Sequence, residues 1–151
     1  MIKDNNTPIH IMLADDDEDD RNFFNDAIND LKINNKLTIF NNGKELMDYL
    51  ENPEIVLPDI LFLDLNMPCK TGNECLKDIR SNPKFKDISI AIYSTSSSDK
   101  DIEETFVGGA NIYIKKPNDF SKLKKVLQEV MSLNWQFHTS KLNKDTFFFS
   151  I

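Results

Sequence analysis

The 151-residue sequence has no apolar stretch long enough to cross a membrane. Its opening residues, 1–6, lack the apolar segment of a signal peptide. It has two cysteines, Cys69 and Cys75, with neither metal-ligand spacing nor a histidine pair beside them. We therefore expect two reduced thiols and a cytoplasmic location, because disulfide frameworks belong to oxidising compartments.

Tracts rich in lysine and arginine are also missing. The formal net charge is −7, which disfavours binding to the phosphate backbone of nucleic acid or to an anionic membrane. The hydrophobic share of 40% and the charged share of 28% are ordinary for a globular protein. A chain of this length is the size of one domain and can bury a core.

Short apolar runs alternate with amphipathic stretches up to about Trp135. The runs predict strands over residues 9–14, 37–40, 59–63, 88–93 and 111–114. Helical spacing predicts helices over residues 20–32, about 43–50, 72–80, 99–107 and 119–133, and Asn42 with Glu45 resembles a capping box before the second. Five strands alternating with five helices indicate a parallel sheet covered by helices on both faces.

Acidic, hydroxyl and basic side chains directly follow several of these predicted strands. Asp64 ends the apolar run 60–63 and opens a loop that contains Pro68 and ends at Gly72. Right-handed crossovers bring such loops to one edge of the sheet, where open α/β sheets bind ligands. The same edge is expected to collect residues that follow other strands: Asp15, Asp16, Asp17, Ser94 and Lys116.

Taken in order, these motifs resemble the receiver domain of bacterial response regulators, the CheY-like family. The resemblance rests on the acidic pair after strand one, Asp-x-x-Met-Pro-x-x-x-Gly from Asp64 to Gly72, the hydroxyl of Ser94, and Lys116-Pro117. It implies an α/β, flavodoxin-like fold: a doubly wound five-stranded parallel sheet of order 2-1-3-4-5. We assign residues 9–135 to the receiver domain, 1–8 to an N-terminal lead and 136–151 to a C-terminal extension.

The resemblance implies a single-domain response regulator, a phosphoacceptor signalling domain rather than an enzyme. Asp64 would accept a phosphoryl group from a sensor histidine kinase or phosphotransfer protein. Mg²⁺ (or Mn²⁺) would be bound by Asp16, Asp64 and the backbone carbonyl of Asn66. Asp15 would hold a metal-bound water. Lys116 would supply positive charge to the transferring oxygens.

The run of three aspartates leaves the register of the acidic pair open between Asp15-Asp16 and Asp16-Asp17. Strand alternation favours the first pair. The other acids are interpreted as residues of the first helical turn, where they complement the helix dipole: Asp17, Glu18, Asp19 and Asp20.

Two residues carry the switch that the resemblance implies. The hydroxyl of Ser94 would bind the new phosphoryl oxygen, and the aromatic ring of Tyr113 would then turn from outside to inside. This would alter the face formed by helix four, strand five and helix five, for a downstream protein target or for a homodimer. Strand alternation should direct Thr95 away from Asp64.

Further residues are assigned by alignment with the same motifs. Lys116 matches the family's lysine, and alternation points Lys115 away from it. The Lys116-Pro117 bond resembles one that is cis in the family. Asn66 and Ser96 occupy positions that tune the access of water to the acyl phosphate.

The end of the chain departs from the family. The last helix carries Val126, Leu133 and Phe137 on a face next to its core stripe, and residues 145–151 are strongly apolar and prone to form a strand. Exposed, this terminus would promote aggregation. We expect it to dock on its own domain or on a neighbouring subunit, near the switch face.

Two other functions fit part of the pattern. A Mg²⁺-dependent phosphatase with an aspartate nucleophile would usually place a second acid two residues later, where this chain has Asn66, and would need a cap domain. A receiver-like module that binds partners without phosphorylation would be marked by loss of Asp64, Asp16 or Lys116, and all three are present.

Overall fold

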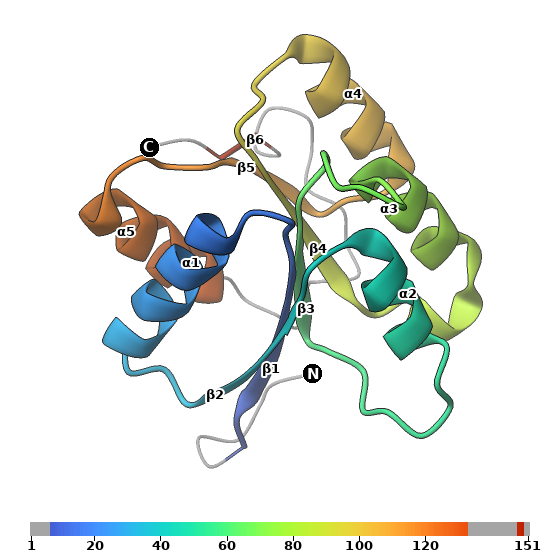
Figure 1. The fold of residues 1–151 in the computed structure, drawn as a ribbon, viewed down its shortest axis with the longest axis horizontal. Coiled ribbons are helices and arrows are strands. Elements are labelled where there is room, and N and C mark those ends of the chain that lie inside the picture. The colour runs from blue at the N-terminus through green and yellow to red at the C-terminus, as the bar shows by residue number, and fades with distance from the viewer. Residues whose placement is uncertain (1–6, 133–147, 150–151) are drawn as a thin grey trace.

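A computed structural model describes residues 7–132 and 148–149, and it shows a central sheet with helices on both faces (Figure 1). The strands are β1 (Ile9–Ala14), β2 (Asn35–Phe40), β3 (Ile60–Leu63), β4 (Ser89–Ser94), β5 (Ile112–Lys115) and β6 (Phe148–Phe149). The helices are α1 (Glu18–Asp30), α2 (Gly43–Leu50), α3 (Gly72–Ser81), α4 (Asp99–Gly108) and α5 (Phe120–Met131), with a short 3-10 helix, η1 (Pro83–Phe85). None of the described helices is both long and apolar enough to cross a membrane.

The strands are parallel and lie in the order β2-β1-β3-β4-β5-β6. The predicted order 2-1-3-4-5 is confirmed. The sheet extends further than predicted, because Phe148 pairs with Tyr113 and Phe149 with Ile114 at the open side of β5. The strand β6 therefore lies on its own domain. Residues 133–147, including Leu133 and Phe137, lie outside the described residues.

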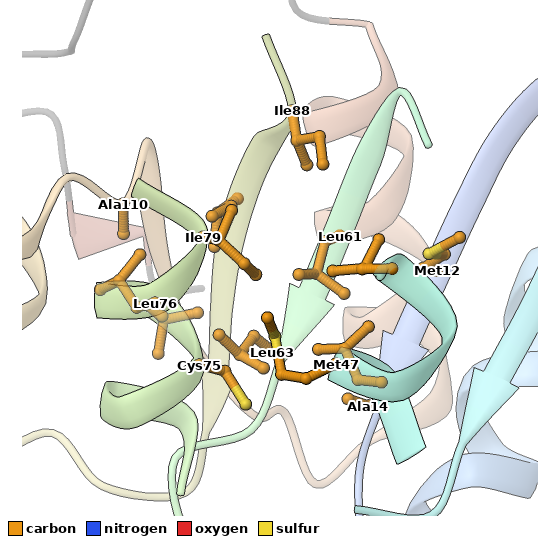
Figure 2. Close-up of a cluster of buried hydrophobic side chains, with 14 of the residues drawn as sticks. Met12, Ala14, Met47, Leu61, Leu63, Cys75, Leu76, Ile79, Ile88 and Ala110 are labelled. Atoms are coloured by element: carbon orange, nitrogen blue, oxygen red, sulfur yellow. The ribbon is translucent and has the colours of Figure 1, made fainter. Parts of the chain in front are cut away.

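Two apolar clusters hold the layers together. Figure 2 shows the first, to which α2 contributes Met47, α3 contributes Leu76 and Ile79, and β3 contributes Leu61 and Leu63. The second lies on the opposite face, beneath α1 and α5. All four residues of β3 are buried, as expected for a central strand covered on both sides.

Three details of the fold differ from the sequence prediction: the start of α1, the position of Val126 and the peptide bond before Pro117. α1 begins at Glu18 rather than residue 20, because Asp17 caps it and accepts a hydrogen bond from the Asp20 backbone N–H. Val126 is completely buried in the core and does not contribute to a separate face of α5. The predicted cis bond before Pro117 is wrong: the peptide bonds described are trans, which is the lower-energy form even before proline.

The capping interactions also differ from the prediction. Asn42 caps α2 as expected, but the Glu45 carboxylate accepts from the N–H of Asn41 rather than that of Asn42. A reciprocal capping box occurs instead at α3, between Thr71 and Glu74. This box fixes the point where the loop after β3 enters its helix.

Gly72 holds that loop against the end of β3. Its N–H donates to the carbonyl of Leu65 at 2.9 Å. A Cβ atom at this position would lie 2.2 Å from the carbonyl oxygen of Asp64 and 2.8 Å from the Cα of Leu65. Only glycine permits this approach, since backbone atoms cannot move aside as a flexible side chain can.

We predict that Gly72→Ala lowers the free energy of unfolding by about 1–3 kcal/mol, because the added methyl group overpacks a backbone contact. Urea denaturation measures the change. Gly108→Ala is the matched control, since the nearest atom that a Cβ there meets is the end of a side chain, Leu76 Cδ2 at 2.9 Å, rather than backbone. Equal stability of the two variants would contradict this account of Gly72.

Candidate functional site

The ends of β1 and β3 place two carboxylates side by side. Asp15 directly follows β1, and its N–H donates to the carbonyl of Phe40. Asp64 directly follows β3, and its N–H donates to the carbonyl of Ala14. Backbone hydrogen bonding thus continues one residue past each strand, which fixes the backbone from which both side chains project. Asp15 is fully buried and Asp64 is 5% exposed.

Three carboxylates form a cluster that could hold a metal ion. One oxygen each of Asp15, Asp16 and Asp64 can be chosen so that all lie within 4.8 Å of one another. Asp16 is exposed at the rim, so the cluster is open to solvent on its side. Carboxylate oxygens are suitable ligands for Mg²⁺ and Mn²⁺, so these residues fit a hard divalent cation.

Two residues next to the cluster, Asp17 and Asn66, make contacts of their own. The side chain of Asp17 caps α1, and its backbone N–H donates to Asp15 Oδ1 at 3.0 Å. The structure therefore groups Asp15 with Asp16, and not Asp17, near Asp64. Asn66 is exposed, and its backbone N–H binds the Asp64 carboxylate. A metal bond to the Asn66 carbonyl stays a prediction.

Lys116 brings a positive charge to the same point. Its Nζ lies 2.8 Å from Asp15 Oδ2 and 3.4 Å from Asp64 Oδ2, and its side chain is 7% exposed. Its backbone N–H donates to the carbonyl of Ser94 at 2.7 Å, so pairing with β4 fixes its direction. Lys115 is exposed, as alternation along the strand predicts.

Sequence reasoning missed one contact of this ammonium group. Asp20 Oδ2 also lies 2.8 Å from Lys116 Nζ, although Asp20 was assigned only to the first turn of α1. The two residues are 96 positions apart. No pattern in the sequence indicates this pair, because Asp16 lies before the N-cap of α1 and shares no helical face with Asp20.

The charges perturb one another because they lie in a desolvated site. Burial raises the pKa of Asp64, the Lys116 ammonium group lowers it and the neighbouring Asp15 carboxylate raises it, and the net result is a pKa of about 6. Burial also raises the pKa of Asp15. For Lys116 burial alone would lower the pKa, but the ion pairs with Asp15, Asp20 and Asp64 outweigh it and raise the pKa above its usual range.

A hydrogen-bond network follows β4 beside this cluster. Ser94 is fully buried, and its Oγ accepts from the N–H of Ser96 at 3.1 Å. The Ser96 hydroxyl donates to Asp101 Oδ2 in α4 at 2.6 Å. Tyr113 is completely buried, and its hydroxyl donates to the carbonyl of Ser96 at 2.9 Å. Thr95 is exposed, away from the network, as predicted.

The two cysteines are free thiols in the structure, Cys69 exposed and Cys75 buried. Cys69 has a positive φ of 69° in the loop between β3 and α3. Burial raises the pKa of Cys75 to about 11, so this thiol is protonated at neutral pH. Neither cysteine belongs to the carboxylate cluster.

The comparisons with known proteins agree with this geometry. The family model of the response regulator receiver domain matches residues 11–128. Response regulator Rcp1 of Synechocystis sp. is 29% identical over 136 residues, 87% of this chain and 92% of Rcp1. The Mn²⁺-bound structure of Rcp1 matches with a TM-score of 0.75 at 28% identity over 83% of this chain and 94% of that one. The phosphorylated cyanobacterial phytochrome response regulator RcpA matches with a TM-score of 0.77 at 28% identity, over 91% and 98%.

We predict that Asp64→Asn stabilises the metal-free protein at neutral pH. The pKa of Asp64 is about 6 in the folded chain against an ordinary 3.8, so between about pH 4 and 6 the folded state holds more protons than the unfolded state. Stability therefore falls as pH rises through this window, and asparagine removes that loss. The expected gain is about 1–3 kcal/mol, since each pKa unit corresponds to about 1.4 kcal/mol.

Urea denaturation in the presence of a chelator, at pH 4.5 and pH 7.5, measures this gain. The difference between Asp64→Asn and the unsubstituted protein should be larger at pH 7.5. A variant less stable than the unsubstituted protein at pH 7.5 would show that the ionised Asp64 is stabilised, not strained, by its surroundings.

Proposed function

The chain belongs to the family of response regulator receiver domains, and from that premise we propose that it is a switch of a two-component phosphorelay with Asp64 as its phosphoacceptor. The donor would be a sensor histidine kinase or a phosphotransfer protein. The observation that supports this most strongly is the meeting of Lys116 and a three-carboxylate cluster at the buried end of β3. A cytoplasmic location stays a prediction.

The proposed reaction is transfer of a phosphoryl group from histidine to aspartate. An oxygen of Asp64 attacks phosphorus and forms a P–O bond while the P–N bond to the donor histidine breaks. The leaving imidazole keeps the electron pair of that bond and takes a proton from solvent. Asp64 must be ionised to attack, and with a pKa of about 6 it is an anion at neutral pH. Lys116 lies where it can neutralise the phosphoryl oxygens.

A divalent cation, Mg²⁺ or Mn²⁺, would offset the repulsion between the Asp64 carboxylate and the anionic phosphoryl group. Asp16 and Asp64 would bind it directly, Asp15 through a water, and Asn66 through its carbonyl. The oxygen-only donor set supports this assignment. The similar Rcp1 is known in a Mn²⁺-bound form.

The switch would run through Ser94. Its hydroxyl now accepts from the N–H of Ser96, and a phosphoryl oxygen on Asp64 would draw it away and move the loop before α4. Tyr113 is already buried and binds the carbonyl of that loop, the orientation expected of the phosphorylated state, although Ser94 still accepts from the N–H of Ser96. Asn66 and Ser96 remain proposed regulators of hydrolysis. The Ser96 hydroxyl is held by Asp101, which orients it toward α4.

The output surface would be the face of α4, β5 and α5, for a downstream target or a second copy of the chain. β6 lies at the edge of this face, since Phe148 pairs with Tyr113. Pairing by the terminus covers the open edge of β5, and an uncovered edge invites another chain.

The two alternative functions are supported less well. A phosphatase of this type usually has an acid where this chain has Asn66. A binding module independent of phosphorylation gives no reason to keep buried carboxylates at a cost in stability.

We predict that incubation with Mg²⁺ and acetyl phosphate or a phosphoramidate adds one phosphoryl group to the protein. Intact-mass spectrometry detects the product. Asp64→Asn removes the acceptor and should give no product, and a chelator should prevent the reaction. Asp16→Asn should slow it at least tenfold, because one ligand of the cation is lost.

Asp17→Asn is the matched control for Asp16→Asn. It removes the same charge from the same acidic run, but asparagine still caps α1 and the residue lies outside the carboxylate cluster. An unchanged mass of the unsubstituted protein under all conditions would leave only the binding-module function.

We predict that truncation after Thr139 increases self-association, because it removes β6 and uncovers the edge of β5. Sedimentation velocity over a range of protein concentrations measures the change. Unchanged self-association and solubility would show that the terminus protects no surface.

A further inference from the structure

The ammonium group of Lys116 has an anchor outside the carboxylate cluster. Asp20 Oδ2 lies 2.8 Å from Lys116 Nζ, closer than the 3.4 Å that separates this nitrogen from Asp64. Asp20 is the third residue of α1, and its side chain is 37% exposed. Its backbone is held by the Asp17 cap, so the carboxylate starts from a fixed position.

The other close partner of Lys116 is needed elsewhere. Asp15 is both 2.8 Å from the ammonium group and a member of the cluster that fits a divalent cation. A cation bound there offsets the charge of Asp15 and of Asp64, so both attract Lys116 less. Asp20 is outside that cluster, so a cation bound there weakens the attraction between Asp20 and the ammonium group less.

A lysine side chain needs such an anchor to stay in one position. Confining its flexible four-carbon stem costs conformational entropy, and the ammonium group is repelled by a cation bound nearby. The ring of Tyr93 adds a contact, with Nζ 5.3 Å from its centroid, but this contact gives less direction than an ion pair. Asp20 supplies that direction.

We propose that Asp20 is a positioning residue: it holds the ammonium group of Lys116 beside Asp64 when a divalent cation occupies the cluster, so that the charge is already in place for the incoming phosphoryl oxygens. Asp20 does not contact the phosphoryl group itself and acts through Lys116. This inference rests on the proposed phosphotransfer at Asp64.

The first test observes the Lys116 ammonium group directly and needs no phosphorylation. A held, poorly exposed ammonium exchanges its protons slowly and gives a ¹⁵N–¹H signal, assigned by its loss in Lys116→Met. In Mg²⁺-saturated protein we expect this signal to persist in the unsubstituted chain and to broaden beyond detection in Asp20→Asn. Asp19→Asn is the matched control, because it removes the same charge from the same turn of α1 at an exposed position. A signal retained in Asp20→Asn would overturn the proposal.

The second test separates positioning from a general effect of charge. The maximal rate of phosphorylation by acetyl phosphate at saturating Mg²⁺ should fall about tenfold in Asp20→Asn and recover in part in Asp20→Glu. In the Lys116→Met background the same Asp20→Asn change should have no further effect. An equal fall in that background, or in Asp19→Asn, would overturn the proposal.

The two tests also distinguish this inference from the proposed function. If the unsubstituted protein takes up no phosphoryl group, the phosphoacceptor function fails, while the ammonium signal still decides whether Asp20 holds Lys116. If phosphorylation occurs normally and the signal is unaffected by Asp20→Asn, the function stands and the positioning role fails.

Discussion

The buried ammonium group of Lys116 is within ion-pair distance of three carboxylates, those of Asp15, Asp20 and Asp64. Two of these acids are almost completely withdrawn from water at the ends of parallel strands, where an unpaired charge would be costly. The raised pKa values of Asp15 and Asp64 show that Lys116 compensates only part of the cost of their burial. What remains is a site with excess negative charge, suited to a divalent cation.

The rest of the fold keeps this unfavourable arrangement in place. The sheet continues its hydrogen bonds past the ends of β1 and β3, so the backbone that carries each carboxylate is fixed. Gly72 packs its backbone against Asp64, and the capping box of Thr71 and Glu74 fixes the next helix. The apolar clusters on both faces stabilise the fold and offset the free-energy cost of burying these charges.

The same strand connects the charged site to the outer edge of the sheet. Tyr113 and Lys116 are three residues apart at the end of β5, and Tyr113 also pairs with Phe148 of β6. Ser96, in the loop before α4, is bonded to both β4 and β5. Its N–H donates to the Ser94 hydroxyl, and its carbonyl accepts from the Tyr113 hydroxyl. A displacement of Ser94 would therefore reach the edge of β5 through a few hydrogen bonds rather than through the whole core.

The sequence by itself determined the alternation of strands and helices, and with it the edge at which Asp15, Asp64 and Lys116 meet. The spacing of apolar residues and the position of a residue at the end of a strand are local properties of the sequence. Right-handed crossovers then place the ends of all the parallel strands at one edge of the sheet. Tertiary structure alone decided the ion pair of Asp20 with Lys116, the burial of Val126 and the pairing of β6 with β5. Each of these depends on the distance between segments far apart in the chain, which side-chain packing sets and no local pattern encodes.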